Sequence, residues 1–402
     1  MRVVFLSPRY PNEMRQFTRG LAEVGVEVLG VGDGHPDPEL RRYLHDYLEV
    51  PSLTDEEDLI RRIRGWLRGR TVDLILANWE PLVLTAARLT EMFGLRGMSV
   101  DTVRGFRDKQ LMKERVATAG LRVPKSARAA SVDGVRGAIE QIGYPAIIKP
   151  ISGAGSADTF RVDSPAALAE ILPQLRHVQE VSCEEFIQGQ EFTYDTVCIG
   201  GKPVYESVTQ YLPNALEMRS QEWVSPIMLS VRDLTQPHIQ RGIELGRSVL
   251  AALNMGDGMT HMEWFLKPDG EVVFGEIACR PGGACVVDLM NYTGDIDLFR
   301  EWARSVCWHA FETSTERKYN VGIVFKRAKG HGRITAITGL TQFYDRYRNY
   351  IVEDTLLRPG AQRRDWKATL LSDGYIVVRH PDWQTTKDMT IDAATDIQIY
   401  AS

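Results

Sequence analysis

Two glutamates in one short stretch are the first candidates for chemistry in this sequence. Glu263 and Glu276 lie in β-rich runs, Met262–Lys267 and Glu271–Ala278, which an Asp-Gly turn signal at 269–270 separates. A two-residue loop there predicts a hairpin in which the two glutamates face each other directly. Side chains so opposed have Cβ atoms about 4.5–5.5 Å apart, where like charges repel. We therefore expect a cation between them, and oxygen ligands suit Mg²⁺.

The same register determines what surrounds the pair. It sets Phe265 opposite Phe274 on the face that carries the glutamates, so this face is not simply exposed to solvent. A register shifted by one residue would instead place Glu263 and Glu276 on opposite faces, half-exposed and without a shared ion. The hairpin alone leaves both interpretations open.

A lysine that ends a buried-looking strand, followed by small residues, is a candidate phosphate site. The run at 144–149 ends on Lys149, and Ser-Gly-Ala-Gly-Ser follows at 152–156. Small residues allow backbone N–H groups to close on phosphate oxygens. The lysine precedes the glycines, so the pattern is not the G-x-x-x-x-G-K-S/T phosphate loop. A flexible connector is the alternative.

Lys109 is a second candidate for an anion contact. Asp108 is a good N-cap and Gly120 a good stop for a helix between them. Lys109 would then lie in the first turn, where the helix dipole disfavours a cation, and a bound anion would relieve that conflict. An ordinary surface lysine is the alternative interpretation.

The elements that position these residues begin with a parallel α/β layer. Strands and helices alternate over residues 1–105, with strands at 2–7, 26–31 and 72–77 and helices at 12–23, 54–66 and 81–93. Thr54 and Glu57 form a capping box for the second helix. No G-x-G-x-x-G follows the first strand, so dinucleotide binding is not supported. Glu80 follows the third strand, where such sheets place ligands, but we favour a helix-entry role.

Later segments supply the remaining elements. Residues 121–190 are predicted to form a compact βαβ-βαβ unit. The polar segment 211–231 is expected to be irregular and to face the substrate with Arg219, Glu222 and Trp223. From residue 320 the chain is β-rich, and the expected strands include those near 366–371 and 375–380.

Composition excludes several classes of protein. The chain of 402 residues is 44% hydrophobic and 25% charged, with a net charge of −5 and no block of one sign, so neither nucleic acid nor a membrane surface is an expected partner. No apolar run approaches the roughly 18 residues of a membrane span. The five cysteines form no Cys-x-x-Cys pair, which predicts reduced thiols in a cytoplasmic protein. We interpret Cys279 and Cys285 as packing residues.

With these motifs in order, the chain resembles the ATP-grasp superfamily, in its branch of carboxylate–amine ligases that includes amino-acid ligases and biotin-carboxylase-like enzymes. The order carries the resemblance: Asp-Lys at a helix start, a strand-ending lysine with a Gly-Ser loop, Glu-Glu-Phe-Ile-x-Gly-x-Glu, then His-x-Glu and Glu-x-x-x-Arg-Pro on a hairpin. It covers roughly residues 100–310. The resemblance implies an α/β (α+β) fold with an N-terminal Rossmann-like domain (1–106), a linker helix and α+β lid (107–190), an ATP-grasp core (191–310) and a β-rich closing subdomain (311–402).

The resemblance also implies roles for the nucleotide-side residues. Lys109 and Lys149 would contact ATP phosphates. The mobile loop over the phosphates would comprise Ser152, Gly153, Gly155 and Ser156, and the hinge whose backbone holds adenine would comprise Glu184, Glu185, Phe186 and Ile187. Glu191 would bind the ribose hydroxyls.

The remaining implied roles concern metal and substrate. Glu263 and Glu276 would hold Mg²⁺, with Mn²⁺ as a substitute, and Arg280 would bind the anionic substrate or its acyl phosphate. Many relatives have Asn two residues after the second glutamate, whereas this chain has Ala278. Alanine offers no ligand, so a second ion would depend more on phosphate and water.

The activity expected from this resemblance is ATP-dependent amide formation. A carboxylic acid, expected to be an amino acid, would be phosphorylated and then attacked by an amine, with Lys149, Glu276 and Arg280 in the catalytic centre. Alternatives are a bicarbonate-activating carboxylase, a purine-pathway ligase and a non-catalytic nucleotide-binding regulator. Small-molecule acids and amines are the expected partners, and the family suggests a homodimer.

Overall fold

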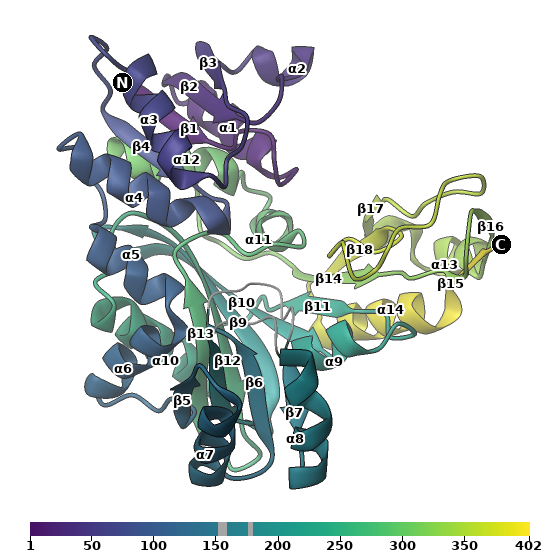
Figure 1. Ribbon diagram of the computed structural model, residues 1–402. Coiled ribbons are helices and arrows are strands. Elements are labelled where there is room, and N and C mark those ends of the chain that lie inside the picture. The colour runs from purple at the N-terminus through teal and green to yellow at the C-terminus, as the bar shows by residue number, and fades with distance from the viewer. Residues whose placement is uncertain (152–158, 176–179) are drawn as a thin grey trace.

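The computed structural model describes residues 1–151, 159–175 and 180–402. Its described residues form four sheets (Figure 1). The N-terminal sheet lies at one end of the molecule, a large central sheet follows, and the C-terminal segment projects as an arm to one side. The α/β fold class predicted from the sequence is confirmed. Among the described residues, no helix is both long and apolar enough to cross a membrane.

The N-terminal sheet is parallel, as predicted. Its strand order is β3-β2-β1-β4, and the strands are β1 (Arg2–Leu6), β2 (Glu27–Gly32), β3 (Asp46–Glu49) and β4 (Leu74–Ala77). The chain runs from β1 outward to β2 and β3 and then returns to place β4 on the other side of β1, and ligands bind at such switch points beyond the carboxyl ends of the strands. The segments that follow β1 and β4 carry Glu13 and Glu80.

Helices cover this sheet and link it to the next domain. They are α1 (Met14–Glu23), α2 (Pro38–Arg41), α3 (Glu56–Trp66), the short η1 (Glu80–Leu82), α4 (Val83–Met92), α5 (Val100–Arg107) and α6 (Lys109–Thr118). The predicted capping box of α3 is wrong, because Asp55 is the N-cap and its carboxylate accepts the Asp58 N–H at 3.2 Å. Asp108 caps α6 as predicted.

A smaller sheet follows, with strand order β5-β8-β6-β7. It contains β5 (Ser126–Ala129), β6 (Ala146–Pro150), β7 (Phe160–Val162) and β8 (Val181–Glu185), with helices α7 (Val132–Ile142) and α8 (Pro165–Ile171) and the short η2 (Leu172–Leu175). The chain order of strands and helices agrees with the predicted βαβ-βαβ unit. The neighbouring strands are nevertheless antiparallel.

The central sheet has eight strands in the order β13-β12-β9-β10-β11-β14-β18-β17. They are β9 (Gln190–Ile199), β10 (Lys202–Leu212), β11 (Ile227–Ser230), β12 (Gly258–Leu266), β13 (Val272–Ala278), β14 (Asn320–Phe325), β17 (Ile351–Asp354) and β18 (Tyr375–His380). The sheet continues across residue 310, where the sequence suggested a domain boundary, and that boundary stays a prediction.

Helices pack on both faces of the central sheet. They are α9 (Ala215–Ser220), α10 (Pro237–Ala252), α11 (Val286–Gly294), α12 (Leu298–Trp308), α13 (Leu340–Tyr347), η3 (Arg348–Tyr350) and α14 (Trp383–Asp396). On one face, Trp264 stacks on Phe192 with ring centroids 4.7 Å apart, and the glycine at 242 admits the indole because a Cβ there would lie 2.2 Å from it. On the other, Phe17 and Trp302 join α1 to α12 edge to face at 4.9 Å.

The C-terminal predictions are partly wrong. Residues 366–371 are not a strand, and helices α13 and α14 were not predicted, so the last segment is mixed and not mainly β. A small sheet of β15 (Lys329–Gly330), β16 (Ile334–Thr338) and β19 (Gln398–Ala401) completes it. The segment 211–231 is also more ordered than predicted, because it holds the end of β10, helix α9 and the whole of β11.

Candidate active site

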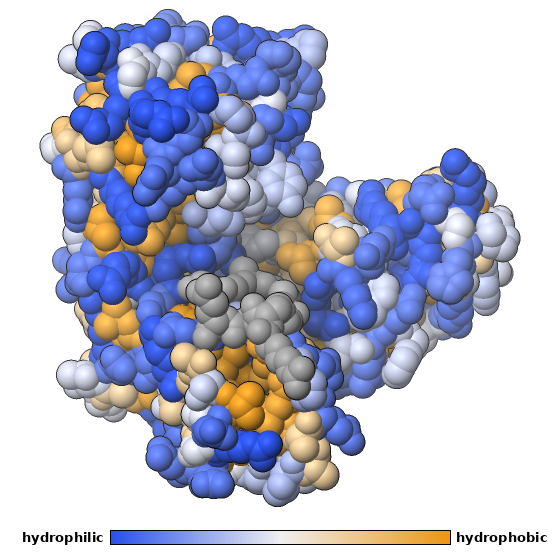
Figure 2. All heavy atoms as spheres, in the orientation of Figure 1, coloured by the Kyte–Doolittle hydropathy of each residue, from blue (hydrophilic) through white to orange (hydrophobic). Residues whose placement is uncertain are grey.

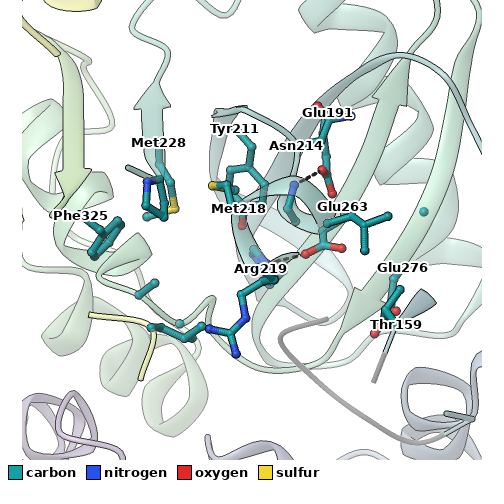
Figure 3. A pocket seen from close by; sticks show the side chains of 18 of the residues that line it. Thr159, Glu191, Tyr211, Asn214, Met218, Arg219, Met228, Glu263, Glu276 and Phe325 are labelled. Carbon is teal, nitrogen blue, oxygen red and sulfur yellow. Dashed lines mark hydrogen bonds and ion pairs between the residues drawn. The ribbon is translucent and has the colours of Figure 1, made fainter. Parts of the chain in front are cut away.

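One large cavity of about 1770 Å³ lies where the N-terminal sheet, the small sheet and the central sheet meet. Figure 2 shows this face of the molecule hollowed between the N-terminal block and the C-terminal arm. Glu263 and Glu276 lie on neighbouring strands at one end of the cavity, and Met228 and Phe325 lie at the other (Figure 3). The described residues proposed from the sequence to bind nucleotide, metal or the substrate carboxylate all line it.

Glu263 and Glu276 are paired across the β12–β13 hairpin, as predicted. The hairpin departs from the prediction in two places, the loop and strand β13, and the two departures compensate each other. The loop has three residues, since the Lys267 N–H donates to the Glu271 carbonyl at 2.9 Å. A bulge at Gly275 then restores the register, and a Cβ at Gly275 would lie 2.8 Å from the Glu263 carbonyl oxygen.

The aromatic pairing predicted beside the glutamates is wrong for the same reason. With the three-residue loop, Phe265 pairs with Val273, and Phe274 pairs with Trp264. Phe274 is buried in the core, whereas Phe265 lines the cavity. The bulge therefore turns the glutamates and Phe265 to the cavity and Phe274 away from it.

Two lysines hold the Glu276 carboxylate. Lys109 Nζ lies 2.6 Å from Oε1, and Lys149 Nζ lies 3.3 Å from Oε2. Burial would raise the pKa of Glu276, but Lys109 and Lys149 lower it well below its ordinary value. Burial also raises the pKa of Glu263, whose neighbour Glu276 adds to the rise. The site therefore contains one firmly ionised carboxylate and one whose pKa is raised.

A buried network extends from this pair into the small sheet. Lys149 Nζ also lies 3.1 Å from Glu184 Oε2, and the other Glu184 oxygen accepts from Lys113 Nζ at 2.6 Å and from Ser182 Oγ at 2.8 Å. Burial opposes ionisation of Glu184, yet Lys149 and Lys113 lower its pKa to about 2. Lys113 was not identified from the sequence, although its place one turn after Lys109 on α6 was a usable signal.

The strand end at 184–187 lines the cavity next to this network. The N–H groups of Glu185 and Phe186 already donate to backbone carbonyls, and the Glu185 carboxylate accepts from Arg122 at 2.8 Å. Within the described chain, no residue accepts a hydrogen bond from the N–H of Ile187, so this donor is available to a planar base. Phe186 lies under the guanidinium of Arg161 at 4.1 Å.

Glu191 is buried at the start of β9. Its carboxylate accepts the Ala215 N–H at 2.6 Å, at the start of α9, and burial together with nearby Glu263 raises its pKa. A ribose contact through Glu191 stays a prediction. The predicted loop residues Ser152, Gly153, Gly155 and Ser156 lie outside the described residues.

Arg280 extends from the end of the hairpin toward the N-terminal sheet. Its Nε donates to Glu80, and the second Glu80 oxygen accepts from Arg107. Glu80 therefore does more than begin a helix: it lines the cavity and fixes the guanidinium of Arg280. The position of Glu80 directly after a parallel strand indicated this role, but the sequence analysis favoured helix entry instead.

His261 and Asp195 form a second buried pair beside Glu263. His261 Nδ1 lies 2.6 Å from Asp195 Oδ1, and its Nε2 lies 3.9 Å from Glu263 Oε1. Burial would lower the pKa of His261, but Asp195 raises it. Sequence reasoning noted the His-x-Glu spacing without assigning a role to the histidine.

The predicted substrate loop is only partly in place. Arg219 lines the cavity (Figure 3) and donates to the carbonyls of Trp366 and Lys367 at 3.2 and 2.8 Å. Glu222 pairs instead with Arg363, and Trp223 is 80% exposed. The cysteine side chains at 279 and 285 form no disulfide, and burial raises the thiol pKa of each to about 12, which agrees with packing roles.

The donor set suits a hard divalent ion that keeps water and phosphate ligands. Glu263 and Glu276 supply oxygen donors from adjacent strands. In the part of the chain that the structure describes, no group of three His, Cys, Asp or Glu side chains surrounds a common point, so the protein would not enclose an ion alone. Mg²⁺ is usually bound by one or two carboxylates, substrate phosphates and several waters.

Comparison with known proteins agrees with this geometry. Residues 114–290 match the ATP-grasp domain family. The chain contains an ATP-grasp domain. The whole chain superimposes on the crystal structure of an L-amino acid ligase from Bacillus licheniformis with a TM-score of 0.81, 18% identity and 98% of that chain covered. N5-carboxyaminoimidazole ribonucleotide synthetase from Thermotoga maritima gives a TM-score of 0.72, at 18% identity and 99% coverage of that chain. The ATP-grasp fold is thus confirmed.

The curated relatives match this chain over only part of their own length. An L-arginine-specific L-amino acid ligase from Bacillus subtilis is 27% identical over 264 residues, which are 63% of this chain and 62% of that protein. Alanine–anticapsin ligase from Bacillus subtilis is 25% identical over 286 residues, which are 66% of this chain and 59% of that protein. The matched region spans less than two thirds of either relative.

Proposed function

We propose that this ATP-grasp protein is an ATP-dependent ligase that joins a carboxylic acid to an amine and releases ADP and phosphate. The observation that supports it best is the placement of Glu276 between Lys109 and Lys149, directly across from Glu263 and in the same cavity as Arg280. A protein that only bound nucleotide would not need this combination of phosphate-binding cations, metal ligands and a substrate-side arginine.

The reaction must activate a poor electrophile. Transfer of the γ-phosphoryl group of ATP to a carboxylate oxygen gives an acyl phosphate, in which phosphate is a good leaving group for attack by an amine. Lys109 and Lys149 would stabilise the negative charge on the transferring phosphoryl oxygens. Arg280, held by Glu80, would orient the carboxylate with its planar fork of donors. A divalent ion on Glu263 and Glu276, Mg²⁺ or Mn²⁺, would neutralise further phosphate charge.

The nucleotide would lie along the small sheet. The hinge from Glu184 to Ile187 would hold adenine through the Ile187 N–H, and Glu191 would contact ribose.

Amino acids are the proposed substrates. Two curated relatives are named as ligases of amino acids, one specific for L-arginine and one that joins alanine to anticapsin. The two relatives are named for different substrates, so the acid that this chain uses must be identified from the residues of its own cavity. A homodimer in the cytoplasm stays a prediction.

Product analysis tests this proposal. The protein is incubated with Mg-ATP and pooled amino acids, and nucleotides, phosphate and new masses are followed together. ADP and phosphate that appear only with certain acids, with a new amide mass, would support the ligase. AMP and pyrophosphate would contradict the acyl-phosphate route, and turnover that depends on bicarbonate would favour a carboxylase.

A further inference from the structure

The segments that follow strands β1 and β4 form one wall of the main cavity. They contribute residues 9–13 and 78–80 to its lining. The two strands are parallel neighbours, so their carboxyl ends lie side by side. The order of strands reverses between them, and open α/β sheets bind ligands at such points. We call residues 9–13 and 78–80 the edge pocket.

Asn78 has an unmet hydrogen-bonding group inside the edge pocket. This residue is only 6% exposed, and in the described parts of the chain no group accepts a hydrogen bond from its amide nitrogen. Buried side-chain amides are normally paired, because an N–H that loses water without gaining an acceptor destabilises the fold. Asn78 borders the cavity, so a molecule bound there can supply the missing acceptor.

Tyr10 and Trp79 give the edge pocket an aromatic surface. Their rings meet edge to face, with centroids 5.2 Å apart and planes at 89°. Both residues line the cavity, and Tyr10 is 57% exposed. The contact therefore joins the two segments of the edge pocket and leaves much of the tyrosine uncovered. An uncovered ring beside a cavity is a surface on which an aromatic group of a ligand can pack.

The turn that carries Tyr10 is held by hydrogen bonds from both of its flanks. The Tyr10 carbonyl accepts from the Ser7 hydroxyl, and the Pro8 carbonyl accepts from the Thr18 hydroxyl at 3.0 Å. Ser7 has a φ of +58°, a left-handed conformation that persists in serine only where the surrounding structure imposes it. Tyr10 is therefore fixed beside Trp79, unlike an ordinary exposed side chain.

Glu80 joins the edge pocket to the reacting end of the cavity. It follows Trp79 directly in the chain, and its carboxylate accepts a hydrogen bond from Nε of Arg280. Arg280 is the residue proposed to orient the carboxylate of the acid. A substrate held by Arg280 is therefore a direct neighbour of the edge pocket.

The charges of the edge pocket are largely matched inside the protein. Arg9 lies 3.5 Å from Asp33, and Glu80 accepts from two arginines. Burial raises the pKa of Glu13, which favours the uncharged form of that carboxyl. An uncharged aromatic side chain therefore suits this pocket better than a charged one.

We infer that the edge pocket binds the aromatic side chain of an amino-acid substrate, and that Asn78 donates a hydrogen bond to a carbonyl or carboxylate oxygen of the same molecule. That this ligand is a substrate rests on the proposed ligase function, whereas the binding chemistry does not. Both the acid and the amine of the reaction carry such an oxygen, and both must reach the reacting carbon. Blocked amino acids distinguish the two roles, since N-acetyl-L-phenylalanine can react only as the acid and L-phenylalaninamide only as the amine.

Calorimetric titration tests the aromatic surface without turnover. Each blocked phenylalanine and its alanine counterpart are titrated into the protein with Mg²⁺ and a non-hydrolysable ATP analogue present. We expect at least one phenylalanine probe to bind about tenfold more tightly than its counterpart, because only it can pack a ring on Tyr10 and Trp79. Tyr10→Ala should abolish this preference, and Tyr10→Phe should keep it. Tyr350→Ala is the matched control, because Tyr350 is also exposed and edge to face with a ring, His380, but does not line the cavity.

Asn78→Leu tests the amide separately. The substitution nearly keeps the size of the side chain and removes the unpaired N–H. The melting temperature without ligand should therefore stay the same or rise, while binding of the preferred probe should weaken about fivefold. A large fall in the melting temperature, or unchanged binding of the probe, would overturn the role of Asn78 in binding.

The remaining outcomes separate this inference from the proposed function. Equal binding of the phenylalanine and alanine probes, or a preference that survives Tyr10→Ala, would overturn the inference. If amino acids are ligated but neither phenylalanine probe is preferred, the ligase stands and the inference falls. If the preference depends on Tyr10 while no amino acid is ligated, the binding site stands and the ligase falls.

Discussion

The two ends of the cavity place the same kind of side chain in opposite electrostatic surroundings. At one end, Glu184 and Glu276 are buried against Lys109, Lys113 and Lys149, and their pKa values fall. At the other, Asp288 is surrounded by acids, and burial together with Glu353 and Glu13 raises its pKa to about 7. Burial acts in the same direction on all of these carboxyls, so the neighbouring charge decides the outcome. We propose that the first end binds phosphate and metal.

The largest expected effect comes from removing the charge at the centre of the first end. Glu276→Gln keeps the side-chain volume but loses the carboxylate that faces Glu263 and holds both lysines. We expect turnover to fall by about 10²–10³-fold, the range seen when one preorganised electrostatic group is lost. Steady-state ADP release measures it, and circular dichroism shows whether the fold is intact. Near-normal rates in a folded variant would exclude this hairpin as the metal site.

A smaller loss is expected from Lys149→Ala. This change removes the cation shared by Glu276 and Glu184, at 3.3 and 3.1 Å. We expect kcat/KM for ATP to fall by about 10²-fold, because a phosphate contact and a positive charge are lost together. Lys387→Ala, on helix α14, is a control in which another cavity-lining lysine is removed. Unchanged ATP kinetics in the Lys149 variant would make that lysine purely structural.

Glu80→Gln tests the link between the two ends. It leaves Arg280 in place but removes the carboxylate that positions the guanidinium. We expect the KM for the carboxylic acid to rise about tenfold, with the KM for ATP little changed, since orientation of one substrate is lost. If Glu80 were purely structural, the substitution would alter the KM values for the acid and for ATP together, or neither of them. Both KM values are therefore measured on one preparation.

The smallest effect concerns the pH dependence of stability at the second end. The titratable groups that interact with Asp288 are Glu13, Glu353, Cys285 and Tyr292. Because its folded pKa is about 7 against an ordinary 3.8, the stability that Asp288 contributes is fully present below pH 3.8 and is lost as pH rises through 7.

Asp288→Asn should remove this dependence. Its melting temperature should match that of wild type near pH 4 and exceed it by a few degrees at pH 8, at roughly 2–4 °C for each kcal/mol. Thermal melts between pH 4 and pH 8 measure the difference. A constant difference across this range would mean that Asp288 does not titrate there.

Local sequence signals predicted the first end of the cavity well. Asp108 caps its helix because N-cap preference depends on the nearest backbone N–H groups. Glu263 faces Glu276 although the loop is one residue longer than predicted, because the bulge at Gly275 compensates. In a single sequence, a glycine within a predicted strand is the only sign of a bulge, and it is not a reliable one.

The second end was not predicted, for a physical reason. Glu13, Asp288 and Glu353 are brought together by packing between elements that are 275 and 65 residues apart along the chain, and no local pattern encodes such a meeting. Helix α14 was also missed: four threonines and three aspartates in its 14 residues are weak helix formers, and packing on β14 and β18 stabilises it.

The measurement that tests the central claim most directly follows oxygen from the acid. The amino acids are labelled with ¹⁸O in their carboxylates, mixed with Mg-ATP and the protein, and the released phosphate is analysed by mass spectrometry. An acyl-phosphate route transfers one ¹⁸O from the acid to phosphate for each amide formed. Label in AMP would show adenylation, and amide formation with unlabelled phosphate would contradict the proposed mechanism.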